Sequence, residues 1–180
     1  MIIESELVEQ LKSKTNVDIA FKELVTLYKE RLYWHIRNIV KSHDDADDVL
    51  QNTFIKVYKN IDNFKGDSKL FSWMYRIATN ESISFINKNT KRLQITNEET
   101  QRLELNKLTS DVYFEGDAIQ FKLQQAIALL PQKQQLVFNM KYFEDLKFKE
   151  MSEILETSEG ALKASYHIAV KKIESYLIND

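Results

Sequence analysis

A stripe of amides, hydroxyls and cations in the first half of the chain has the chemistry of a nucleic-acid contact. Its members recur at helical spacing: Arg76, Asn80, Ser84, Asn87, Lys88 and Lys91. The surrounding segment, 65–94, carries six cations against two carboxylates, a net charge of +4. Phe71, Trp73 and Tyr75 add aromatic surface, and rings beside cations are the groups that stack on unpaired bases. A solvated helix face beside core aromatics is the alternative.

A second such face lies near the C-terminus. Its residues are small or basic and are spaced along one side of a helix: Gly160, Lys163, Ala164, His167 and Lys171. The opposite side carries an apolar stripe of Leu162, Tyr166, Ala169 and Ile173. About three residues separate this helix, 158–177, from a shorter one, 148–155, which are helix-turn-helix proportions. A small, basic face suits the major groove of duplex DNA, and an ordinary solvated face is again the alternative.

Catalytic and metal chemistry find little support. The chain has no cysteine, and its three histidines, His35, His43 and His167, are dispersed. The acidic cluster at 44–48 lacks the glycine of a calcium loop and is interpreted as first-turn carboxylates of a helix. Three glycines cannot build a phosphate-binding loop. The sequence therefore predicts no enzyme, no metal and no cofactor.

The composition predicts an all-α fold. Only 3 glycines and 1 proline occur in 180 residues, too few for the turns of a β protein, while 43% of the residues are hydrophobic and can form a core. No apolar run is long enough to cross a membrane, and no export signal is visible. Since the chain has no cysteine that would need an oxidising compartment, we expect a cytoplasmic protein without membrane insertion.

Hydrophobic spacing predicts helices in two groups. The first group begins with one long helix or two broken helices over 16–42. A second helix carries an apolar stripe of Leu50, Phe54, Val57, Tyr58 and Ile61. A turn at 63–68 precedes a third helix over 70–91. Ser42, Asp44 and Asp45 are candidate N-caps of the second helix. The later group begins at Ile119, Leu123, Ile127 and Leu130 and continues with helices at 131–143, 148–155 and 158–177, Pro131 taking the first helical position. We expect two helical domains, 1–94 and 118–180, joined by an acidic linker, 95–117.

Several strings resemble one known family. DADDVLQNTF (45–54), NFKGDS (63–68) and FSWMYRIATN (71–80) resemble the signature of the extracytoplasmic-function (ECF, group 4) sigma factors of bacterial RNA polymerase. Leu130-Pro131, Val137-Phe138, FKEMSEIL (148–155) and SEGALK (158–163) resemble that family's C-terminal helix-turn-helix. The motifs occur in the family's order over about 16–176.

The resemblance implies a sigma factor with a region 2 domain at 1–94 and a region 4 domain at 118–180. It implies docking on core RNA polymerase, at the β′ clamp helices and the β subunit, with Asp47, Asp48 and Gln51 facing the clamp. The linker would thread through the active-site cleft and the RNA exit channel. An anti-sigma factor is a further expected partner.

The resemblance also assigns the promoter contacts. The melted -10 element would be read by Phe64, Lys65, Ser68, Arg76, Asn80, Ser84, Asn87, Lys88 and Lys91, with Phe64 and Asn80 capturing a flipped base. The -35 duplex would be read by Ser158, Lys163, Ser165, His167, Lys171 and Lys172. Two rival hypotheses remain open at this point: a helix-turn-helix regulator that acts without core polymerase, and a helical interaction module with no nucleic-acid role.

Overall fold

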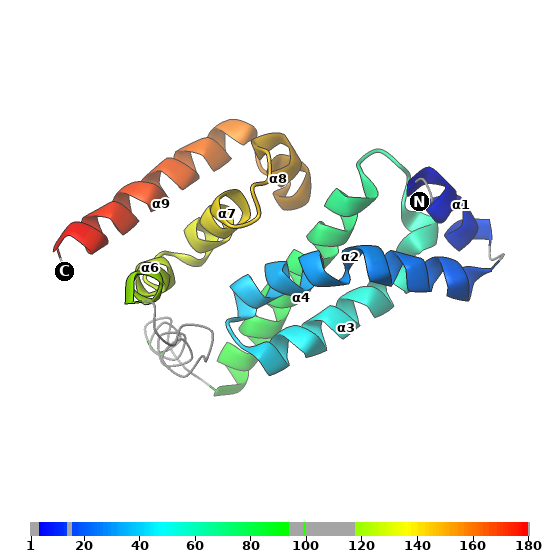
Figure 1. Cartoon of the computed structure of the whole chain (residues 1–180), viewed down its shortest axis with the longest axis horizontal. Coiled ribbons are helices and arrows are strands. Elements are labelled where there is room, and N and C mark those ends of the chain that lie inside the picture. The colour runs from blue at the N-terminus through cyan, green and yellow to red at the C-terminus, as the bar shows by residue number, and fades with distance from the viewer. Residues whose placement is uncertain (1–3, 14–15, 94–98, 100–117, 180) are drawn as a thin grey trace. The chain divides into compact units, whose positions relative to one another are not determined.

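The structure, a computed structural model, describes residues 4–13, 16–93, 99 and 118–179. Within these residues the regular elements are all helical, which confirms the all-α expectation. In chain order they are α1 (Glu4–Ser13), α2 (Val17–Val40), α3 (His43–Asn60), the 3₁₀ turn η1 (Ile61–Asn63), α4 (Leu70–Leu93), α6 (Ala118–Ala128), α7 (Gln132–Tyr142), α8 (Phe148–Leu155) and α9 (Glu159–Asn179) (Figure 1).

The chain divides into two compact units, residues 1–85 and 86–180, with the division inside α4. Most of the expected acidic linker, 95–117, lies outside the described residues. The linker and the domain boundaries at its ends therefore remain predictions.

In the first unit, α2, α3 and α4 bury their apolar sides together. Their most deeply buried large side chains are Leu24, Leu32, Ile36, Leu70, Met74 and Tyr75. The segment 16–42 forms one helix rather than two, and it ends where Lys41 adopts a left-handed backbone conformation with φ 60°. Ser42 then caps α3, because its hydroxyl accepts a hydrogen bond from the Asp45 N–H at 3.4 Å.

A buried polar contact joins α2 to α4. His35 is fully buried, and its Nε2 lies 2.8 Å from the Thr79 hydroxyl. Because that hydroxyl donates to the Tyr75 carbonyl at 2.8 Å, it accepts from His35, which places a proton on Nε2. The contact fixes which side of α4 faces the core at the residue before Asn80.

Helix α1 is an element that the sequence analysis did not predict. It buries Leu7 and Leu11, packs on α2 and also contacts η1, beside which it lies in Figure 1. Only these two apolar positions, one turn apart, are buried among the ten residues of α1. The hydrophobic periodicity is therefore too short to predict a helix from the sequence.

Several residues of the predicted apolar stripes lie at the surface instead: Ile19, Leu27, Tyr58, Ile119 and Leu177. Tyr58 is 48% exposed, and its ring meets the Phe21 ring edge-on, with 5.1 Å between centroids. Ile119, in the first turn of α6, is 80% exposed.

The second unit packs α6, α7 and α8 against α9. One cluster of its core comprises Ala126, Ile127, Leu130, Phe138, Ala169 and Ile173. Pro131 is the N-cap of α7, one position earlier than expected, so the helix begins at Gln132. Helix α8 has the predicted bounds, and three residues, 156–158, separate it from α9 as a helix-turn-helix requires. None of the helices that the structure describes is long and apolar enough to cross a membrane.

Candidate nucleic-acid and polymerase interfaces

The expected polymerase contact forms one exposed face of α3. Asp47, Asp48 and Gln51 are all exposed, while the core side of the helix carries the buried Val49 and Leu50. Positions 47 and 48 both lie about one turn before position 51, so each carboxylate is a neighbour of the Gln51 amide. They present carboxylates and an amide, which suit a basic partner surface.

The polar stripe of α4 also forms a continuous exposed face. Asn80, Ser84, Asn87, Lys88 and Lys91 are exposed, and Arg76 is half-buried. The opposite side of the helix is buried through Met74, Ala78 and Ser82. No side-chain hydrogen bond joins Asn80 to another residue in the described ranges, so its amide is available as both a donor and an acceptor.

One carboxylate lies next to this stripe, and it is paired. Glu81 follows Asn80 and accepts a hydrogen bond from the Lys56 ammonium of α3. The Glu81 side chain is 16% exposed, against 53% for Lys56. Sequence spacing alone gave no sign of Lys56, because the pair joins two different helices.

The turn between η1 and α4 is open at its tip and held at its base. The Phe64 N–H donates to the Ile61 carbonyl at 3.0 Å, which closes η1. Gly66 has φ +83°, a left-handed conformation that favours glycine. Lys65, Gly66 and Asp67 are exposed, and Ser68 is half-buried.

Phe64 itself is covered. Its side chain is 7% exposed, its ring lies 5.3 Å from the Trp73 ring, and the Lys12 ammonium lies 5.8 Å from its centroid. In this arrangement the ring presents little surface on which a base could stack. The sequence analysis did not identify Lys12, because it predicted no helix at α1.

The C-terminal face predicted from spacing is exposed on α9. Gly160, Lys163, Ala164, His167 and Lys171 all lie at the surface, opposite the buried Leu162, Ala169 and Ile173. Lys163 is the most constrained of them, because it pairs with Glu159 at 3.5 Å and lies 5.7 Å from the centre of the Phe148 ring.

The other three residues assigned to -35 reading are placed differently. The Ser158 hydroxyl accepts from the Ala161 N–H at 3.3 Å and so caps α9. Ser165 is half-buried, about 100° around the helix from Ala164. Lys172 is exposed and donates to the Gln134 side chain of α7 at 3.1 Å. The structure therefore groups Lys163, His167 and Lys171, with Ser165 and Lys172 on the flank of that face.

Comparisons with known proteins cover both units. The sigma-70 region 2 family model matches residues 24–92, and the sigma-70 region 4 model matches residues 120–173. The ECF RNA polymerase sigma factor SigW of Bacillus subtilis is 32% identical over 82% of this chain and 83% of its own length. The chain belongs to the ECF RNA polymerase sigma factors. The alternative of a regulator that acts without polymerase is not favoured, since both sigma regions are present in order.

Solved structures of other proteins share this sigma-factor fold. CnrH in complex with the cytosolic domain of CnrY has a TM-score of 0.71 at 21% identity, over 98% of each chain. The sigma factor RpoE of Bartonella quintana, in complex with the anti-sigma factor NepR, has a TM-score of 0.67 at 20% identity, over 89% of this chain and 98% of RpoE. At this level of identity the likeness concerns the fold.

The region 2 match of this sigma factor contains α3, the turn at 64–69 and nearly all of α4. Helix α1 lies before the match. The region 4 match contains α7 and α8 and the part of α9 that carries the exposed basic face.

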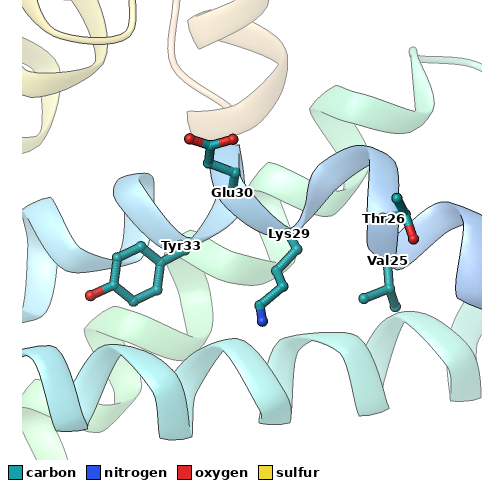
Figure 2. A pocket seen from close by; sticks show the side chains of 5 residues that line it. All are labelled: Val25, Thr26, Lys29, Glu30 and Tyr33. Atoms are coloured by element: carbon teal, nitrogen blue, oxygen red, sulfur yellow. The ribbon is translucent and has the colours of Figure 1, made fainter.

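A shallow groove on α2 is the remaining surface feature of region 2. It encloses about 480 Å³ and is lined by Val25, Thr26, Lys29, Glu30 and Tyr33. Figure 2 shows Lys29 and Tyr33 projecting toward α3, and Glu30 projecting to the other side. The Tyr33 hydroxyl is hydrogen-bonded to His43 Nδ1 at the start of α3. All the lining side chains come from one helix, so the groove offers no converging pair of acid and base.

Within the residues that the structure describes, no three histidine, aspartate or glutamate side chains are grouped so that they could hold an ion.

Proposed function

We propose that this sigma factor is a non-catalytic, cytoplasmic subunit that directs core RNA polymerase to promoters by reading melted -10 DNA and -35 duplex. Three exposed surfaces, each on a helix of its own, support this: the acidic face of α3, the polar face of α4 and the small, basic face of α9. Each surface carries the groups that its target needs. Carboxylates suit basic clamp residues, amides and cations suit bases and phosphates, and a slim helix face suits a major groove.

The availability of Asn80 carries the -10 proposal. Trp73 contacts Phe64 at the base of the 64–69 turn, and Asn80 lies two turns further along the same side of α4, about 10 Å away. An exposed amide there can present a donor and an acceptor to the Watson–Crick edge of a flipped base. The exposed cations on the stripe, Lys88 and Lys91, would hold the adjacent phosphates.

Replacing Asn80 tests this assignment. Asn80→Ala should remove about 1–3 kcal/mol of discrimination at a single -10 position, because one bidentate base contact is lost. Open-complex formation on promoters varied at each -10 position measures the effect. Asn89→Ala is the matched control, since this amide lies on the opposite side of the same helix. An unchanged -10 preference in Asn80→Ala would show that the residue is part of a solvated face.

Core binding is tested at the α3 face. Asp48→Lys combined with Gln51→Ala should weaken association with core polymerase in a competition assay while helicity is retained, because both side chains point away from the core. Undiminished association would remove the clamp-docking assignment.

The chemistry of α9 limits what region 4 can read. No arginine occurs after Arg102, so the bidentate arginine contact to guanine is not available there. Lys163, His167 and Lys171 would make most of the contacts, with Ile168, which is 45% exposed, against a thymine methyl. We expect a -35 element weighted toward A and T. Promoter selection from a randomised library tests this, and a run of guanines contacted by α9 would contradict it.

An anti-sigma factor is proposed as a further partner. The sigma factor RpoE of Bartonella quintana, which shares this fold, was solved with the anti-sigma factor NepR. Such a partner would compete with core polymerase or promoter DNA for this chain. Purification of the native protein from its own cells would show whether a partner protein is bound to it.

A further inference from the structure

Lys12 reaches from the N-terminal helix to the turn that we assign to -10 reading. Its ammonium donates a hydrogen bond to the backbone carbonyl of Phe64, 52 positions away in sequence, and lies 5.8 Å from the centre of the Phe64 ring. The two contacts bind the same residue through its backbone and its side chain. A cation–π interaction and a charge-assisted hydrogen bond to a carbonyl both become stronger when they are partly shielded from water. Lys12 is half-buried, so both contacts are favoured here.

Helix α1 is itself held at both ends, so Lys12 is not a free side chain on a loose terminus. Leu7 and Leu11 are buried, with exposed fractions of 1% and 4%. At the start of α1, the Glu4 carboxylate is hydrogen-bonded to the Tyr28 side chain of α2. At its end, Lys12 contacts Phe64, and the body of the helix contacts α2 and η1 (Figure 1).

Phe64 is consequently fixed from three directions. Its N–H is bound to the Ile61 carbonyl, its ring packs against Trp73, and its carbonyl accepts from Lys12. The carbonyl contact sets the orientation of the peptide group between Phe64 and Lys65. From that peptide group onward the chain is exposed up to Asp67, so the contact decides where the open part of the turn starts.

We propose that Lys12 is a positioning residue for -10 recognition, acting through Phe64 and not by touching the base. This inference rests on the proposed role of the turn and of Asn80. It gives α1, which precedes the region 2 match, a part in promoter selectivity. It also assigns to the Phe64 ring the role of an anchor, in agreement with its burial.

The test compares Lys12→Met with Lys12→Arg and with Lys22→Met. Methionine keeps the length of the stem and removes the charge and the donors, whereas arginine keeps both. Lys22 is an exposed lysine on α2 and serves as the matched control. Two readouts are needed: hydrogen exchange of the amides of residues 64–69 in the free protein, and the -10 preference of the reconstituted holoenzyme in open-complex formation.

In Lys12→Met we expect exchange in the turn to rise about fivefold and discrimination at the position read by Asn80 to fall by a similar factor, the loss of about 1 kcal/mol from a partly exposed contact. Lys12→Arg and Lys22→Met should resemble the wild type in both readouts. Association with core polymerase should not change.

Three other outcomes would overturn the proposal. Unchanged exchange in the turn shows that Lys12 does not hold it, whatever the turn does. An equal rise in α1 and in the turn shows that Lys12 secures α1 and not Phe64. Faster exchange confined to the turn, with an unchanged -10 preference in Lys12→Met but an altered one in Asn80→Ala, shows that base reading does not depend on this contact. If Asn80→Ala also leaves the preference unchanged, the proposed -10 function has itself failed.

Discussion

The pairing of Glu81 with Lys56 matters because a carboxylate beside Asn80 would otherwise repel the DNA backbone. Lys56→Met should leave that charge uncompensated and lower the affinity of the holoenzyme for the -10 single strand severalfold at low salt. Stability should also fall, by roughly 1 kcal/mol or more, because the Glu81 carboxylate is only 16% exposed and loses its hydrogen-bond donor. The measurement is a salt titration of single-strand binding, in which the defect should shrink as salt rises. Adding Glu81→Gln should restore affinity, and failure to do so would show that Lys56 acts independently of Glu81.

Glu156 ends α8 in the left-handed region, with φ 51°, and it lies in the turn of the helix-turn-helix. A residue with a Cβ is disfavoured there, by roughly 1–2 kcal/mol. Glu156→Gly should therefore raise the free energy of unfolding of the second unit by up to about 1 kcal/mol, after the greater entropy of glycine in the unfolded chain is counted. Denaturant unfolding followed by circular dichroism measures this. Glu153→Gly, inside α8, is the control and should lower stability.

Among the elements, α1 carries a titratable contact with α2. Burial raises the pKa of the Tyr28 hydroxyl above its usual value of 10.0; the Glu4 carboxylate raises it further, and Arg31 opposes the shift. The folded state therefore favours the neutral phenol. The contribution of Tyr28 to the free energy of unfolding is fully present below the pKa of Tyr28 in the unfolded chain, and it is lost as pH rises through the pKa of Tyr28 in the folded protein. Unfolding free energies between about pH 9 and pH 11 should fall more steeply in the wild type than in Tyr28→Phe. Parallel slopes would contradict the contribution of this contact.

The helices themselves were largely predictable from local rules. The bounds of α8, the cap of α3 at Ser42 and the two sides of α9 all follow from helical periodicity and capping preference. Helix α1 was not predicted, because it buries only Leu7 and Leu11 and owes its place to packing on α2 and η1. Hydrophobic periodicity predicts the apolar side of a single helix, but it does not predict packing between elements that are distant in sequence.

The candidate site was predictable to the extent that it depends on a single helix. The exposure of Asp48, Asn80 and Lys171 follows from their positions opposite apolar stripes. The burial of Phe64 could not be predicted, since Lys12 and Trp73, which cover it, belong to different helices. The same reason hid the pairing of Lys56 with Glu81.

At the scale of the whole molecule, the positive charge is divided. Residues 65–94 carry +4 and residues 158–173 carry +2, while the chain as a whole carries -2. Phosphate neutralisation supplies most non-specific affinity, so the free sigma factor should bind promoter duplex weakly. A mobility shift at about 0.15 M salt without core polymerase checks this. Tight, sequence-specific binding under those conditions would instead support the hypothesis of a helix-turn-helix regulator that acts without core polymerase.

The contact between Trp73 and Phe64 makes tryptophan fluorescence a probe of the turn at 64–69. The chain has two tryptophans, Trp34 and Trp73, and both belong to the first unit. Tryptophan emission therefore reports on that unit alone, whereas helical ellipticity reports on both, and comparing the two melting curves separates the unfolding of the units. In a Trp34→Phe variant the single remaining indole is the one that packs on Phe64, so its emission would follow the -10 turn directly as DNA, core polymerase or an inhibitor arrives.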